Sequence, residues 1–90
     1  MMRRIAVTGA GGFIGGALAL RIDREAGFGA VRIVRDDFSR GLLPEKLAGC
    51  EAVVHLAGES RSTEPEALFR TNLALTEQVA AAVRKTPGIR

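Results

Sequence analysis

The fold of this chain is decided near its start, by the stretch Val7-Thr8-Gly9-Ala10-Gly11-Gly12-Phe13-Ile14-Gly15. Three glycines in this stretch have separate physical roles in a turn from a strand into a helix. Gly9 permits a tight turn, Gly12 lets a bound group approach the backbone, and Gly15 lets the helix pack closely on the sheet. The spacing therefore predicts a strand–turn–helix unit with accessible backbone N–H groups at the helix start.

The residues on both sides of the glycines have the apolar patterns that such a unit requires. Residues 5–7 form a continuous apolar run, which is typical of a strand covered on both faces. From residue 13 to about residue 25, apolar side chains recur at helical spacing, at Ile14, Ala17, Leu18 and Ile22. Residues 27–29, Gly-Phe-Gly, are expected to end this helix.

The alternation of strand and helix continues along the chain. Apolar runs at 31–34 and 52–57 predict two more buried strands. Between them we expect a polar loop over 36–41 and a brief helix over about 44–48, with Pro44 in its first turn. Since crossovers between parallel strands are right-handed, the first strand should lie in the middle of the sheet.

A long helix is expected after the third strand. Thr63 and Glu66 fit a capping box, with Thr63 as the N-cap. Its apolar face is predicted to be wide and to consist of Leu68, Phe69, Leu73, Leu75, Val79, Ala80 and Val83. Residues 87–88 stop the helix, and residues 89–90 approach another strand. The prediction is an α/β, Rossmann-type parallel sheet with helices on both faces, truncated to three strands and two main helices.

The composition excludes several classes of protein. Hydrophobic residues make up 47% of the 90 residues, which indicates a globular chain, and no apolar run is long enough to span a bilayer. The basic residues are scattered and Trp and Tyr are absent, so nucleic-acid binding is not expected. Cys50 is a lone cysteine and His55 lies in an apolar run, so both are interpreted as structural. We expect a cytoplasmic protein without a metal site, a membrane partner or a nucleic-acid partner.

The glycine stretch points to a dinucleotide as the bound group. The N–H groups of Phe13 and Ile14 begin the helix, where the positive end of the helix dipole favours a pyrophosphate. Asp36 ends the second strand about 20 residues beyond Gly15, where an acidic side chain can hold a ribose hydroxyl. A P-loop is excluded because no Gly-Lys-Ser/Thr follows the glycines.

Three motifs in this order resemble the extended short-chain dehydrogenase/reductases, the NAD-dependent epimerase/dehydratase family. The first is the glycine loop TGAGGFIG, and the second is the strand end Leu56-Ala57-Gly58, whose backbone runs along the cofactor in that family. The third is Phe69-Arg70-Thr71-Asn72-Leu73, in which Asn72 inherits a cofactor-contacting role from the resemblance. The implied function is to bind NAD(P) in an oxidoreductase, epimerase or dehydratase that acts on a nucleotide sugar or a similar substrate.

The chain departs from the family pattern in two places. There is no room between Asp37 and Cys50 for the usual third strand, and this short form with HLAGESR is similar to reductases of capsular-polysaccharide sugar synthesis. The family's catalytic Tyr-x-x-x-Lys pair is also missing, since the chain contains no tyrosine. We therefore expect residues 1–90 to be a partial NAD(P)-binding domain whose catalytic and substrate-binding regions are absent. The alternative is a non-catalytic dinucleotide-binding module that associates through its open sheet edge, and the edges also allow a homo-oligomer.

The second strand leaves the choice between NAD and NADP open. Asp36 would accept the ribose 2′-OH and repel a 2′-phosphate, which favours NAD. Arg35 would pair with that phosphate and stack on adenine, which favours NADP. The balance is slightly toward NADP. Residues 59–61, Glu-Ser-Arg, follow the third strand and either line the nicotinamide side or form only a polar loop.

Overall fold

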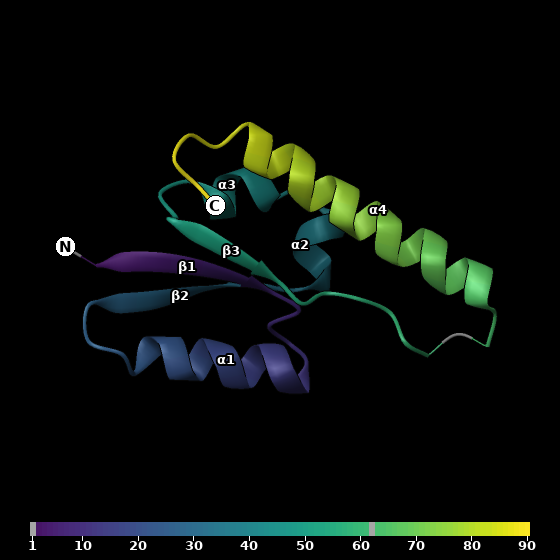
Figure 1. Ribbon diagram of the computed structural model, residues 1–90, viewed down its shortest axis with the longest axis horizontal. Helices are drawn as coiled ribbons and strands as arrows, with labels where there is room; N and C mark the ends of the chain where they lie inside the picture. The colour runs from purple at the N-terminus through teal and green to yellow at the C-terminus, as the bar shows by residue number, and fades with distance from the viewer. Residues whose placement is uncertain (1, 62) are drawn as a thin grey trace.

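A three-stranded parallel sheet forms the centre of the chain in the computed structural model, which describes residues 2–61 and 63–90 (Figure 1). β1 (Arg3–Thr8) lies between β2 (Phe28–Ile33) and β3 (Ala52–His55), in the order β2-β1-β3. Both pairings are parallel, and Ala6 pairs with Val31 on one side and Val53 on the other. The predicted sheet with its first strand in the middle is therefore confirmed.

Helices cover both faces of this sheet, as the sequence predicts. α1 (Phe13–Asp23) lies on one face, while α3 (Leu43–Leu47) and α4 (Pro65–Arg84) lie on the other, with α2 (Arg35–Ser39) near the end of β2 (Figure 1). This order of parallel strands and crossover helices is a Rossmann-type arrangement.

The core follows from the alternation of side chains along β1. Ala6 is fully buried and belongs to a cluster with side chains of α3 and α4, including Leu43, Leu47 and Val79. Its neighbour Val7 is also fully buried, and strand geometry directs it to the opposite face, where α1 lies. A strand covered on both faces reads as a continuous apolar run, which explains residues 5–7.

The segment after β2 differs from the expected polar loop over 36–41. The structure has a short helix there, α2. Phe38 is buried in the core cluster, and the buried Asp37 carboxylate accepts the Val34 N–H at 2.8 Å. The loop prediction was wrong because one apolar residue among polar ones was enough to anchor a helical turn. β2 itself begins at Phe28, inside the 27–29 segment that was expected to end the preceding helix.

The start and the packing of α4 also differ from the prediction. The helix begins at Pro65 with Glu64 in the N-cap position, so Thr63 is not the cap. Proline favours the first helical position because its fixed φ suits the helix and its missing N–H would have no partner there.

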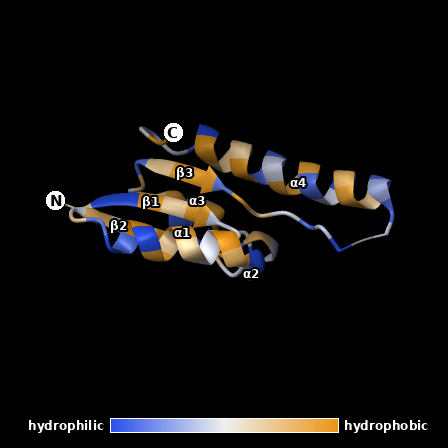
Figure 2. Cartoon of the chain, turned by 60° about the horizontal axis from the view of Figure 1, so that its bottom comes forward, coloured by the Kyte–Doolittle hydropathy of each residue, from blue (hydrophilic) through white to orange (hydrophobic). Residues whose placement is uncertain are grey.

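Only the second half of α4 packs into the core. Val79 is buried, but Phe69 and Leu73 are 66% and 45% exposed. The first half of the helix extends beyond the sheet, and apolar positions continue along it (Figures 1 and 2). The apolar pattern is therefore wider than the buried face, because Phe69 and Leu73 in its first half stay largely exposed.

The free edge of β3 carries the last residue of the chain. The Arg90 N–H donates to the Glu51 carbonyl at 3.0 Å, and the Val53 N–H donates to the Arg90 carbonyl at 2.7 Å. These two hydrogen bonds, from Arg90 to the residues on either side of Ala52, are the pattern of a parallel ladder. Across the described residues, no helix is both long enough and apolar enough to cross a membrane.

Candidate functional site

The glycine turn between β1 and α1 is shaped by close packing. Gly9 has φ of 70°, and a Cβ there would lie 2.9 Å from the Leu56 carbonyl and the Ala57 nitrogen. A Cβ on Gly15 would lie 2.1 Å from the Gly9 carbonyl oxygen. Both positions therefore admit only glycine without movement of the backbone.

The other glycines of the turn leave space on the open side of the backbone. A Cβ on Gly12 would meet only the Gly9 carbonyl oxygen, at 3.4 Å, and one on Gly11 would meet only Val34, at 3.8 Å. Gly12 is the N-cap of α1, so the N–H groups of the next residues have no acceptor within the helix. The side chains of Phe13 and Ile14 are 94% and 70% exposed, and they stand away from the core.

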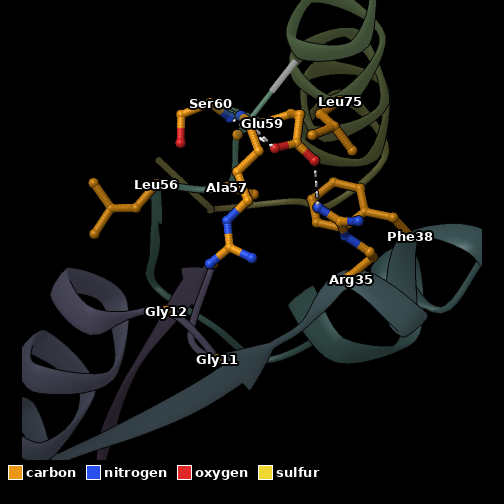
Figure 3. Close-up of a pocket in the computed structure, with 12 residues that line it drawn as sticks. Gly11, Gly12, Arg35, Phe38, Leu56, Ala57, Glu59, Ser60 and Leu75 are labelled. Carbon is orange, nitrogen blue, oxygen red and sulfur yellow. Dashed lines mark hydrogen bonds and ion pairs between the residues drawn. The ribbon is translucent and has the colours of Figure 1, made fainter. Parts of the chain in front are cut away.

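These glycines form one wall of a cleft of about 520 Å³ at the carboxyl ends of the strands (Figure 3). In open α/β sheets this is the edge at which ligands bind. The cleft is lined by the β1–α1 turn, the start of α2, the segment after β3 and one residue of α4, namely Gly9, Gly11, Gly12, Arg35, Phe38, Leu56, Ala57, Gly58, Glu59, Ser60, Arg61 and Leu75.

Of the two residues considered for the choice between NAD and NADP, Arg35 lines the cleft and Asp36 does not. Arg35 lines the cleft as the first residue of α2. Asp36 is not among the lining residues; its side chain is 75% exposed and lies 4.0 Å from Arg40 on the same helical turn. The next residue, Asp37, caps α2 and pairs with Lys46 at 3.0 Å. The Val34 N–H, and after it Lys46, lower the pKa of the Asp37 carboxyl.

The Thr8 hydroxyl joins the ends of β1 and β3. It accepts the N–H groups of Leu56 at 2.9 Å and Ala57 at 3.0 Å, and it lies 2.7 Å from His55 Nδ1. Because these N–H groups turn toward Thr8, β3 ends at His55 and not at residue 57 as predicted. The fully buried Thr8 therefore fixes the backbone that borders the cleft.

His55 continues this hydrogen-bond chain toward α4. The Thr8 oxygen already accepts two N–H groups, so its own hydroxyl hydrogen is donated to His55 Nδ1. Nδ1 is then an acceptor, which assigns the ring proton of His55 to Nε2. Nε2 then donates to Thr76 Oγ1 at 3.2 Å, and the Thr76 hydroxyl donates to the Asn72 carbonyl at 3.0 Å. Burial lowers the pKa of His55, in agreement with a neutral ring. His55 is thus a structural strand residue, as interpreted from the sequence.

Asn72 contacts the loop after β3 and is not among the cleft-lining residues. Its Oδ1 accepts the Glu59 N–H at 2.6 Å, and its Nδ2 donates to the Glu59 carbonyl at 3.2 Å. A Cβ on Gly58 would lie 3.3 Å from the same Oδ1, so the glycine allows this approach. The geometry gives Asn72 the task of holding the loop in place.

Glu59 is the acidic residue among those that line the cleft, and both of its carboxylate oxygens accept hydrogen bonds. Oε1 accepts the N–H groups of Ser60 at 2.9 Å and Arg61 at 2.8 Å. Oε2 accepts a hydrogen bond from Arg35 at 3.1 Å, across the cleft (Figure 3). The Arg61 N–H, the Arg35 side chain and the Ser60 N–H together lower the pKa of Glu59.

The structure thus gathers most of the predicted site residues at one cleft. Gly9, Gly12, Arg35, Leu56, Ala57 and Gly58 line it directly. Phe13, Ile14 and Gly15 lie in the first turn of α1 beside it. Sequence reasoning missed the role of Thr8, although a threonine that ends a buried strand was a signal for such a bond.

Comparison with known proteins agrees with this geometry. Residues 5–90 match the NAD dependent epimerase/dehydratase family. A UDP-2-acetamido-2,6-beta-L-arabino-hexul-4-ose reductase from Pseudomonas aeruginosa is 36% identical over 81 residues. That match covers 90% of this chain and 22% of the relative, so the chain spans about a fifth of the length of the curated relative.

Solved structures share the fold. The UDP-N-acetylglucosamine 4-epimerase from Bacillus cereus superposes with a TM-score of 0.74 at 26% identity, over 97% of this chain and 38% of that one. A uronate dehydrogenase from Agrobacterium tumefaciens, at 24% identity, has a TM-score of 0.68 over 94% of this chain and 37% of its own. By its sequence match and its fold, this chain belongs to the NAD dependent epimerase/dehydratase family.

Proposed function

We propose that this chain binds a nicotinamide dinucleotide in the cleft at the carboxyl ends of β1, β2 and β3. The observation that carries the proposal is the meeting of three elements at one cleft: the glycine turn, Arg35, and the segment Leu56-Ala57-Gly58. Relatives support the same conclusion, since a mutant of the Agrobacterium uronate dehydrogenase has been solved in complex with NAD.

Each part of the cleft suits a different part of such a ligand. The open backbone at Gly12 and the N–H groups of Phe13 and Ile14 would hold the pyrophosphate, because a helix N-terminus favours an anion. Gly9 and Gly15 would keep the turn and the helix close enough for that contact. The backbone of Leu56, Ala57 and Gly58 would border the nucleotide, and Asn72 would keep the following loop in position.

We further propose a modest preference for NADP over NAD. Arg35 lines the cleft, and a guanidinium can bind a 2′-phosphate through two parallel hydrogen bonds. Asp36, which would favour NAD, lies outside the lining residues and beside Arg40.

The chain's contribution to a reaction would be to hold and orient the cofactor. A bound nicotinamide supplies hydride chemistry, and the protein supplies position and electrostatics. Residues 1–90 contain no tyrosine. We therefore propose that the proton-transfer residues lie outside this segment and that the whole protein is a cytoplasmic enzyme acting on a nucleotide sugar, with a homo-oligomer compatible with the fold.

Titration of the chain with NADPH and NADH, followed by nicotinamide fluorescence, tests the proposal. The chain lacks tryptophan, so energy transfer from tryptophan does not contribute to the signal. We expect weak saturable binding, with Kd no higher than about 1 mM, which corresponds to about −4 kcal/mol. Gly12→Val should abolish it, because the added side chain occupies the approach to the backbone.

The control is Ala74→Val, on an exposed position of α4 that does not line the cleft. It should bind like the unchanged chain. Absence of binding by the unchanged chain at millimolar dinucleotide, or equal binding by the Gly12→Val variant, would contradict the proposal.

A further inference from the structure

The ion pair between Arg35 and Glu59 joins two segments, α2 and the loop after β3, that α3 and β3 separate in the sequence. Arg35 is the first residue of α2, and Glu59 lies in the loop after β3. Their side chains meet at 3.1 Å across the cleft (Figure 3). The residue that would recognise a 2′-phosphate therefore already has an anionic partner.

The two partners are held very differently. The backbone N–H and carbonyl of Glu59 both form hydrogen bonds with the side-chain amide of Asn72. The Glu59 carboxylate accepts the N–H groups of Ser60 and Arg61. The Glu59 side chain is 26% exposed, whereas the Arg35 side chain is 81% exposed. Glu59 is thus the fixed partner of the pair, and the Arg35 guanidinium is the one free to move.

We propose that Glu59 determines dinucleotide specificity by restraining Arg35 and so weakening the preference for a 2′-phosphorylated cofactor. This inference rests on the proposed function of the cleft. A 2′-phosphate must draw Arg35 away from Glu59 or share it with the carboxylate. NADH has a neutral hydroxyl at that position, so its binding does not require the ion pair to open.

The electrostatics favour the same outcome. A guanidinium that pairs with a carboxylate has fewer free N–H donors for a phosphate. The Glu59 carboxylate also repels a phosphate that lies against Arg35, since like charges at a shared site are unfavourable. Removing the charge of Glu59 should therefore strengthen NADPH binding more than NADH binding.

Glu59→Gln is the decisive variant. Glutamine keeps a side-chain oxygen that can accept the Ser60 and Arg61 N–H groups, while its amide no longer attracts Arg35. We expect the ratio of NADPH to NADH affinity to rise about fivefold at low salt. An exposed ion pair contributes up to about 1 kcal/mol, and 1.4 kcal/mol corresponds to a tenfold change in affinity.

Two further variants make the result specific. Glu25→Gln removes the same charge from another exposed Arg–Glu pair, the one with Arg21 at 2.9 Å, outside the cleft, and should leave the ratio unchanged. In an Arg35→Ala background, Glu59→Gln should raise the ratio by less than it does with Arg35 present, because only the direct repulsion between the carboxylate and the phosphate is then removed.

The outcomes separate the inference from the proposed function. If both dinucleotides bind but Glu59→Gln changes the ratio by less than twofold, the inference is wrong and the dinucleotide site stands. The inference is also wrong if Glu25→Gln raises the ratio equally. If neither dinucleotide binds the unchanged chain, the proposed function fails and the inference fails with it.

Discussion

Replacing Thr8 by valine should destabilise the fold far more than its small change in shape suggests. The valine side chain fills nearly the same volume but cannot accept the N–H groups of Leu56 and Ala57. Thr8 is fully buried, so little water can reach these N–H groups in its place. A buried donor left without a partner costs about 1–3 kcal/mol, so two of them should lower the free energy of unfolding by about 2–6 kcal/mol.

Thr8→Ser is the matched variant, because it keeps the hydroxyl and removes one methyl group. The loss of a buried methyl group costs about 1 kcal/mol. In a domain of this size, each kcal/mol lowers Tm by about 4–8 °C, so the two variants should differ clearly in a thermal melt. Far-UV circular dichroism is the suitable signal, since the chain has neither tryptophan nor tyrosine. Equal destabilisation by valine and serine, within about 0.5 kcal/mol, would refute the assigned role of the hydroxyl.

Three further results are expected. Gly9→Ala should lower the free energy of unfolding by about 3 kcal/mol, because a positive φ and a close backbone contact both oppose a Cβ. In the same urea titration, Gly12→Ala should lower the free energy of unfolding by less than about 1 kcal/mol. Burial lowers the pKa of His55, so the unfolded chain binds a proton at this ring more readily than the folded chain does. The resulting stability is fully present above about pH 6.5 and is lost as the pH falls. NMR titration of the His55 ring and thermal melts at pH 5 and 7.5 would check this. A ring that titrates above pH 6.5 would contradict this. Asn72→Ala should speed amide hydrogen exchange at Glu59 at least about tenfold, a loss of about 1.4 kcal/mol of protection, and unchanged exchange would show that the loop is held by other contacts.

The sequence was sufficient for the sheet and the glycine turn because both depend on local patterns. A continuous apolar run at residues 5–7 indicates a strand covered on two faces, and the structure has β1 in the middle of the sheet. Gly15 is required by its contact with Gly9 within the same strand–turn–helix unit, and the positive φ of the turn itself favours glycine at position 9. Interactions of this range are encoded in neighbouring residues, so spacing alone reveals them.

The remaining features depend on pairs that are far apart in the sequence. The helix at α2 forms because Phe38 reaches the core and Asp37 meets Lys46, neither of which a polar composition reveals. The start of α4 was misassigned because a capping-box pattern at Thr63 competed with Pro65, and the proline determined the first helical position. The link between Arg35 and Glu59 joins the start of α2 to the loop after β3, and only the assembled sheet brings them together.

The crowding around Gly9 and Gly15 has a consequence for the history of such chains. A descendant that no longer binds any cofactor must still keep these two glycines, because the turn cannot close without them. Gly12 is under no such demand from packing, since an added Cβ would make only an ordinary contact there. Among natural variants, loss of Gly12 with Gly9 and Gly15 intact would therefore mark the lineages that keep the fold but no longer bind the cofactor.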